Sequence, residues 1–179
     1  MARLAGAPLL ALDDFYRDGD HPGLPRAHGV VDWDDLRTWD LPAARDAVAE
    51  LCRTGAATVP GYDIAASRRT GSRVLELGPH RGFVAEGVFA PDLVAPCRAA
   101  GLAVVALFLD RPRTLTLVLR FLRDVRQRRK PVGVLVRRGL ALWRAEPGLR
   151  RHAVGLGCRP VRLAAALAAT AAACGARTG

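Results

Sequence analysis

Short apolar runs alternate with longer segments of helical periodicity along most of the chain. The runs at residues 7–12, 83–89 and 102–109 are apolar almost throughout. Parallel strands that are buried on both faces have this pattern, whereas half-exposed strands alternate apolar and polar residues. The pattern predicts a three-layer α/β domain with a mostly parallel sheet. One domain, residues 1–179, is expected because no repeat or low-complexity linker interrupts the pattern.

Cap and turn residues divide the segments between these runs. Asp40, Pro42 and Gly55 predict a helix that begins at residue 41 and ends at residue 54. Residues 58–71 are expected to form a loop with a short strand, and residues 78–82 form a predicted turn. Further helices are predicted at residues 92–101, which Gly101 closes, at 112–130, at about 132–146 and, in an Ala-rich segment, at about 160–175.

Acidic residues stand at or near the end of each apolar run. Asp13 and Asp14 follow the first run, Glu86 lies in the second, and Asp110 ends the third. A carboxylate at the end of a buried strand is costly to desolvate, and ligands of parallel sheets bind beyond the carboxyl ends of the strands. These acids therefore predict a functional site at that edge of the sheet.

A basic cluster occupies the predicted helix at residues 112–130. Guanidinium groups match phosphate oxygens, so the cluster predicts a phosphate clamp, with a solvated helix end as the alternative. A strand-end carboxylate combined with such a clamp indicates phosphoryl transfer. The cluster consists of Arg120, Arg123, Arg126, Arg128, Arg129 and Lys130, of which the first two share a helix face.

The net charge of +10 at pH 7 would ordinarily indicate a nucleic-acid or membrane-surface partner. Yet Lys130 is the only lysine among 27 basic residues, which is typical of genes rich in G and C. Binding to DNA or RNA is therefore not expected, although a nucleic-acid patch on the arginine-rich helix stays open as an alternative. The four cysteines form no C-x-x-C pair and are expected to be buried small residues: Cys52, Cys97, Cys158 and Cys174.

Neither apolar end of the chain is expected to cross a membrane. The start, MARLAGAPLLAL, has no small-residue cleavage site before Asp13, and it is too short to span a bilayer. The Ala-rich segment near the C-terminus is too short as well. A cytoplasmic protein without a membrane partner is therefore expected.

Five motifs follow one another between about Leu10 and about Glu146: LDDFYRDGDHPGLP, VDWDD, VPGYDIAASRRTG, FVAEGVF and LRFLRDVRQRRK. Their order and spacing resemble the uridine kinase family of P-loop phosphotransferases, in particular bacterial uridine kinase-like proteins. The resemblance implies transfer of the γ-phosphoryl group of ATP or GTP to the 5′-hydroxyl of uridine or cytidine in pyrimidine salvage. It also implies Mg²⁺ as a cofactor and a nucleoside as the partner, and it allows a homo-oligomer.

The resemblance assigns roles to residues on the nucleoside side of the site. Asp13 in DDFY matches the catalytic base, which accepts the proton of the 5′-hydroxyl, and Tyr16 lies in the same motif. Asp34 in VDWDD matches an acid that binds the ribose hydroxyls, with a turn cap as the alternative. Tyr62 in GYDI matches an aromatic residue that contacts the base, with loop packing as the alternative, and Arg69 is a further substrate-binding residue of this segment.

On the phosphate side, Glu86 in FVAEG matches the Walker B-like carboxylate that holds Mg²⁺ through water. Arg120, Arg123 and Arg128 match the substrate and lid arginines that enclose the phosphates. One departure concerns Ser67, which stands about where the family has a histidine that helps read the base. The choice between uridine and cytidine is therefore left open.

The larger departure is a missing P-loop. The motif G-x-x-x-x-G-K-[ST] cradles phosphates with its amides and its lysine, but Lys130 is followed by Pro131 and about a dozen residues precede Asp13. The first strand and the P-loop are thus expected to be absent. We favour a start codon placed too late, because the acids and arginines are retained. A truncated gene is a second explanation, and an inactive nucleoside- or nucleotide-binding module without ATP hydrolysis is a third.

Overall fold

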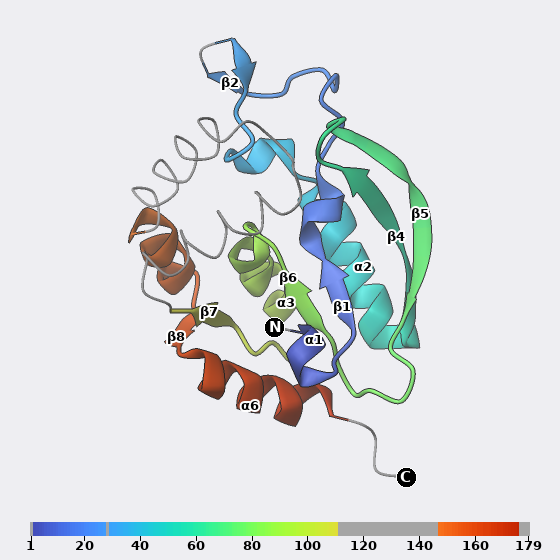
Figure 1. Cartoon of the computed structure of the whole chain (residues 1–179), viewed down its shortest axis with the longest axis vertical. Coiled ribbons are helices and arrows are strands. Elements are labelled where there is room, and N and C mark those ends of the chain that lie inside the picture. Colours follow the sequence, from blue (N-terminus) through green and yellow to red (C-terminus); the bar gives the residue numbers. More distant parts are fainter. Residues whose placement is uncertain (1, 28, 111–146, 176–179) are drawn as a thin grey trace. The chain divides into compact units, whose positions relative to one another are not determined.

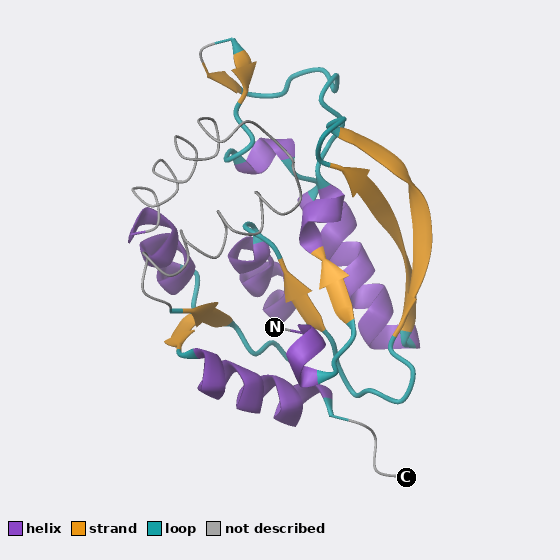
Figure 2. Ribbon diagram, in the orientation of Figure 1, coloured by secondary structure: helices purple, strands orange, loops and turns teal. Residues whose placement is uncertain are grey.

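The computed structural model describes residues 2–27, 29–110 and 147–175 (Figure 1). The predicted helices at 112–130 and about 132–146 lie outside the described residues, and so do Arg120, Arg123 and Arg128. The chain divides into two compact units, one of Met1–Val105 with Leu167–Gly179 and one of Ala106–Ala166. Helices and strands occur in both, so the protein is mixed α/β (Figure 2).

Two short parallel strands lie at the centre of the first unit. Strand β1, Leu9–Ala11, pairs with β6, Val84–Glu86, with Leu9 opposite Val84 and Ala11 opposite Glu86 (Figure 1). Both strands were predicted from the apolar runs, although each is shorter than its run. The chain leaves β1 through a single 3₁₀ turn, η1, Leu12–Phe15.

Helix α2, Leu41–Thr54, has the bounds and the caps that the sequence predicts. The Asp40 side chain accepts a hydrogen bond from the Ala43 amide, and Gly55 ends the helix with a φ of 80°.

The buried face of α2 turns toward the core, whereas Cys52 on the other face is exposed. The expectation of buried cysteines is therefore wrong for Cys52, and it is confirmed for Cys97, Cys158 and Cys174.

A long antiparallel hairpin follows α2, where a loop with a short strand was expected. Strand β4, Ala56–Asp63, pairs with β5, Arg68–Glu76, and the register shifts at Gly61/Tyr62. In β4 the buried positions alternate, since Ala57 and Val59 point inward. In β5 only Leu75 is not exposed. The prediction of a loop is wrong because β5 offers almost no apolar signal of its own and depends on its pairing with β4.

The other elements of this unit are short. Helix α1 spans Ala2–Ala5, β2 at Arg26–Ala27 pairs with β3 at Val30–Val31, and η2 spans Leu36–Thr38. The predicted helix at 92–101 is confirmed as η3, Ala90–Leu93, followed by α3, Val94–Ala99. The chain then turns at Gly101, whose φ is 75°.

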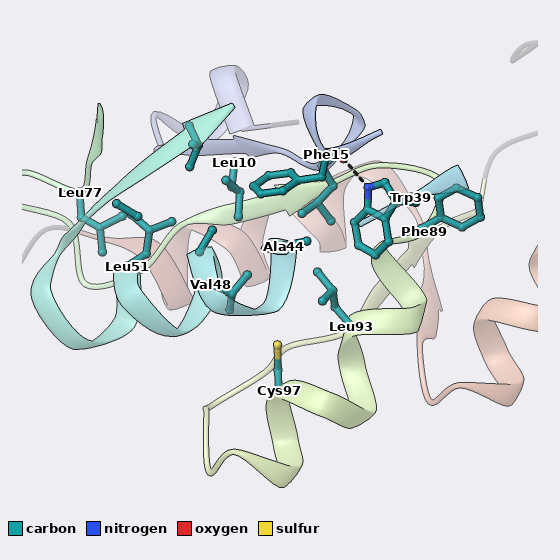
Figure 3. Close-up of a cluster of buried hydrophobic side chains, with 14 residues drawn as sticks. Leu10, Phe15, Trp39, Ala44, Val48, Leu51, Leu77, Phe89, Leu93 and Cys97 are labelled. Atoms are coloured by element: carbon teal, nitrogen blue, oxygen red, sulfur yellow. Dashed lines mark hydrogen bonds between the residues drawn. The ribbon is translucent and has the colours of Figure 1, made fainter. Parts of the chain in front are cut away.

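One apolar cluster joins β1, η1, α2, β4 and α3 in the first unit (Figure 3). Burying a Leu or Phe side chain contributes about 1.5–3 kcal/mol to folding. The α2 residues of the cluster recur at helical spacing, which is the reason that α2 packs on this face. The largest fully buried side chains are Phe15, Leu10, Leu12, Leu51, Val59 and Thr38.

In the second unit, β7, Leu107–Leu109, pairs in parallel with β8, Arg159–Val161. The third apolar run was predicted as a longer strand, and β8 was not predicted, because the segment around Pro160 lacks an apolar run. Residues 147–155 are helical. Helix α6, Leu163–Cys174, confirms the predicted Ala-rich terminal helix. The boundary between the two units falls within this helix.

The described strands form two parallel pairs and two antiparallel hairpins. The three-layer arrangement with one mostly parallel sheet stays a prediction, as does the single domain. In the described part of the chain, no helix has both the length and the apolar composition to cross a membrane.

Candidate functional site

Two carboxylates emerge at the same edge of the β1–β6 pair. Glu86 is the last residue of β6, and Asp13 follows β1 by two residues in η1; both are exposed. Because β1 and β6 are parallel and Ala11 lies opposite Glu86, the chain delivers both acids to the carboxyl ends of neighbouring strands. This is the edge at which the sequence predicts a site. The third acid, Asp110, follows β7 in the other unit, where its Oδ2 lies 3.6 Å from Nε of Arg150.

A glycine after β6 lets the two strand ends approach closely. A Cβ atom at Gly87 would lie 2.8 Å from Cβ of Leu12 and 2.9 Å from Oδ1 of Asp13. Real Cβ atoms do not approach other atoms this closely, so any larger residue would push η1 away. Gly87 was not singled out in the sequence, because its contact with Asp13 comes from a segment far away in the chain.

The two neighbouring aspartates differ in their surroundings. Asp14 forms an ion pair with Arg73 of β5, with 3.2 Å between Oδ2 and Nη2, and only 23% of its side chain is exposed. Asp13 instead lies beside Gly87 at the end of β6. Asp14 therefore ties η1 to the hairpin, whereas Asp13 is the carboxylate at the strand-end edge.

An aromatic cluster adjoins this edge, made of Tyr16, Trp33, Tyr62 and Phe89. The Tyr16 ring is central: its centroid lies 5.6 Å from that of Trp33, at 85° between the planes. It lies 5.9 Å from the centroids of Tyr62 and of Phe89. Tyr16, Trp33 and Tyr62 are half-buried, so parts of these rings face solvent. Half-buried rings of this kind can stack on a planar ligand.

The structure brings Tyr16 and Tyr62 together, as the predicted site requires. It adds Trp33 and Phe89, which the sequence reasoning missed. The only signal for Trp33 was an aromatic residue placed among acids in VDWDD, and Phe89 was taken simply as part of a strand.

The hydroxyls of Tyr16 and Tyr62 both donate hydrogen bonds to backbone carbonyls of the protein. The Tyr16 hydroxyl donates to the Trp33 carbonyl at 3.3 Å, and the Tyr62 hydroxyl donates to the Arg17 carbonyl at 3.1 Å. Burial raises the pKa of Tyr62 above its ordinary value of 10.0, and the negative charge of Asp18 adds to the effect. Tyr62 is therefore a neutral hydrogen-bond donor at physiological pH, and its ring rather than its hydroxyl is the group that can contact a ligand.

Several hydrogen-bond donors of Arg69 bind other residues of the protein. Its Nε donates to the Tyr16 carbonyl at 3.3 Å, and its Nη2 lies 3.2 Å from Oδ2 of Asp40. Its backbone amide donates to Oδ1 of Asp18 at 2.7 Å. Arg69 thus lies beside the aromatic cluster, as the prediction of a substrate-binding residue requires, but its donors contact two other segments of the chain, residues 16–18 and Asp40.

Asp34 lies next to Trp33 and is exposed. Its amide donates to Oδ1 of Asp32 at 3.3 Å, so Asp32, which is half-buried, is the acid that orders this turn. Asp35 caps η2 by accepting from the Arg37 amide at 2.8 Å. Hydrogen bonds from Arg37 lower the pKa of Asp35 from 3.8 to about 2. Asp34 is therefore an exposed acid of this segment, and it follows Trp33 directly in the chain.

The carboxylates at the strand ends fit Mg²⁺ only as a partly hydrated ion. Among residues 2–27, 29–110 and 147–175, no group of three or more His, Cys, Asp or Glu side chains could hold a metal ion. Mg²⁺ often keeps several waters and binds proteins through one or two carboxylates. Asp13 and Glu86 fit binding of this kind, through carboxylates and water. They do not form a cage of protein ligands around a metal ion.

ATP does not fit in the way that P-loop kinases bind it. The sequence contains no G-x-x-x-x-G-K-[ST] motif, and its single lysine, Lys130, lies outside the described residues. The described residues therefore include no phosphate cradle of the P-loop kind.

Comparison with known proteins adds no relative: no family model and no curated protein matches the chain.

Proposed function

We propose that the first unit binds a pyrimidine nucleoside at the carboxyl edge of β1 and β6, and that the protein is a nucleoside kinase of the type it resembles. The observation that carries this is the placement of Asp13 and Glu86 at the ends of two parallel strands, beside half-buried aromatic rings. A nucleoside has a sugar hydroxyl, whose proton a carboxylate can accept, and a planar base, on which aromatic rings can stack.

The expected mechanism concerns the acceptor hydroxyl. Asp13 accepts the proton of the 5′-hydroxyl as the oxygen of that hydroxyl forms the new bond to the γ-phosphorus of ATP. The bond from this phosphorus to the β–γ bridging oxygen breaks, and ADP leaves. Glu86 would hold Mg²⁺ through water, and the bound ion would neutralise charge on the phosphates. Gly87 keeps η1 close to the end of β6, so the two carboxylates stay on one edge.

The nucleoside base is expected to lie against the rings of Tyr16 and Tyr62. Asp34, which follows Trp33 in the chain, is expected to bind the ribose hydroxyls. Because the Tyr62 hydroxyl is already bonded to Arg17, recognition of the base is through ring contact, which is tolerant of the base's substituents. We therefore expect uridine and cytidine to bind with similar affinities. A P-loop-like fold and a cytoplasmic location belong to the same hypothesis.

A second candidate is a nucleoside-binding module without chemistry. It would use the same carboxylates and rings, and binding a nucleoside needs no phosphate cradle. The two candidates share one binding site and differ in whether ATP or GTP is consumed.

Calorimetric titration with uridine tests the shared site. The wild-type chain and Asp13→Asn should bind uridine with similar affinity, since Asp13 acts on the hydroxyl proton and not in binding. Tyr62→Ala should weaken binding by about tenfold or more, the value of one lost base–aromatic contact. Asp46→Asn, at an exposed position of α2, is the matched control. Absence of uridine binding to the wild-type chain would overturn both candidates.

Production of ADP from ATP with Mg²⁺ and uridine separates the candidates when it is measured on the complete protein, with its start taken from the protein purified from its native source. The kinase requires uridine-dependent ADP that Asp13→Asn abolishes, whereas the binding module produces none. Turnover that survives in Asp13→Asn would contradict the role given to Asp13.

A further inference from the structure

The tip of the β4–β5 hairpin is bonded to the loop that follows Tyr16. The Gly19 amide donates to the Ser67 carbonyl at 2.7 Å, and the Arg69 amide donates to Oδ1 of Asp18 at 2.7 Å. The Tyr62 hydroxyl donates to the Arg17 carbonyl. We call these contacts between residues 17–20 and residues 62–69 the hairpin latch.

The backbone at the tip is shaped for this contact. Ser67 has a φ of 49°, a left-handed conformation that residues other than glycine seldom adopt. A Cβ atom at Gly19 would lie 3.1 Å from Cβ and 3.3 Å from the carbonyl oxygen of Ser67. The close approach of the two segments therefore favours glycine at position 19, since a methyl group there would require Ser67 to shift by a few tenths of an ångström.

The latch continues to the start of α2. Asp40 caps α2 with Oδ1 and accepts from Arg69 with Oδ2. Asp40 and Arg69 are 21% and 37% exposed at their side chains, so this pair is less screened by water than most surface pairs. One arginine thus connects the hairpin, the loop after Tyr16 and the helix that carries much of the core.

The contacts of the latch are unequal. Arg68 and Asp20 approach to 2.8 Å, but their side chains are 62% and 69% exposed, and exposed ion pairs contribute little. Asp18 is half-buried, and its carboxylate accepts directly from a backbone amide, which makes a stronger, charge-assisted bond. Asp18 is therefore the side chain on which the latch depends most.

We propose that Asp18 is a positioning residue of the nucleoside site. It holds the hairpin tip on residues 17–20, so that the Tyr62 ring stays 5.9 Å from the Tyr16 ring and the two form one contact surface for the base. Arg69 acts through the same latch and not by touching the substrate. The effect on nucleoside binding rests on the proposed function, whereas the latch itself can be measured without any ligand.

Hydrogen exchange of backbone amides, followed by NMR on the full chain without ligand, tests the latch. In Asp18→Ala the protection of the Arg69 amide should fall about tenfold or more, because its acceptor is gone. Asp18→Asn keeps an acceptor oxygen and should restore most of the protection. Asp63→Ala is the matched control, since Asp63 accepts from the Ala65 amide within the hairpin turn and not across the latch. Unchanged protection of Arg69 in Asp18→Ala would overturn the latch.

Uridine titration of the same variants tests the effect on the site. We expect Asp18→Ala to raise the Kd for uridine about tenfold and Asp18→Asn to raise it about threefold or less. Lost protection of Arg69 with an unchanged Kd would overturn the positioning role while leaving the proposed nucleoside site intact. If the wild-type chain binds no uridine, the proposed function and the positioning role both fail, whereas the exchange result still decides the latch.

Discussion

The indole Nε1 of Trp39 donates a buried hydrogen bond of 2.7 Å to the carbonyl oxygen of Leu12, the residue directly before Asp13 (Figure 3). Trp39 also immediately precedes Asp40, the cap of α2, and its ring packs 5.6 Å from that of Phe89. The bond therefore connects the turn that carries the strand-end carboxylate to the helix that supports the core.

Trp39→Phe should destabilise the protein by about 1–3 kcal/mol, because the Leu12 carbonyl loses a buried donor. The free energy of unfolding, from urea titrations, measures the loss. Trp33→Phe is the control: it keeps an aromatic ring beside Tyr16 at a half-buried position, so a smaller loss is expected. Equal losses in the two variants would show that ring size, and not the bond to Leu12, sets the stability.

Gly87→Ala should displace Asp13, since the added methyl group meets both Leu12 and Asp13 closer than van der Waals distance. The cost of such overpacking is about 1–3 kcal/mol. Urea unfolding measures the cost, and a change in the carboxyl ¹³C resonance of Asp13 reports the displacement. Gly148→Ala adds the same methyl group at a helical position with no neighbouring side chain within 4 Å, so it should leave the Asp13 resonance unchanged and should not lower the free energy of unfolding. A neutral Gly87→Ala variant would contradict the packing described for the strand ends.

Asp35 should titrate at a pH of about 2, because its pKa is lowered from 3.8 by hydrogen bonds from Arg37. A carboxyl whose pKa is lowered by folding stabilises the protein above the unfolded pKa. That contribution is lost as the pH falls from about 4 toward 2. An NMR pH titration of the Asp35 carboxyl measures the value. In Arg37→Gln the pKa should return toward 3.8, and an unchanged pKa there would refute the assigned cause.

Asp40 caps α2 and forms ion pairs with Arg17 and Arg69, so two substitutions separate the cap from the charge. Asparagine caps helices about as well as aspartate, and Asp40→Asn should therefore remove mainly the charge that faces the two arginines. Asp40→Ala should cost about 0.5–2 kcal/mol more, because the Ala43 amide loses its acceptor. Thermal or urea unfolding of both variants measures the difference. Equal stabilities would mean that the cap contributes nothing.

Local signals explain what could be predicted from the sequence. The bounds of α2 follow from Asp40, Pro42 and Gly55, all of which act within one helical turn of its ends. The edge with Asp13 and Glu86 follows from two apolar runs, of which one is followed by Asp13 and the other contains Glu86. Features of this kind need no knowledge of the rest of the fold.

Contacts between distant segments explain what could not be predicted. Strand β5 is almost entirely exposed, so it forms because β4 pairs with it and not because of an apolar pattern. The approach of Gly87 to Asp13 joins positions more than 70 residues apart, and that of Gly19 to Ser67 joins positions almost 50 residues apart. The same holds for Trp33, whose part in the aromatic cluster depends on where Tyr16 lies.

The most direct measurement of the central claim is an NMR titration of the full chain with uridine, followed at the aromatic side chains and at Asp13. A nucleoside site at the carboxyl edge of β1 and β6 predicts saturable shifts at Tyr16, Trp33 and Tyr62, with intermolecular contacts from the base to the Tyr62 ring. Saturable shifts confined to other parts of the chain, or no shifts at millimolar uridine, would contradict it.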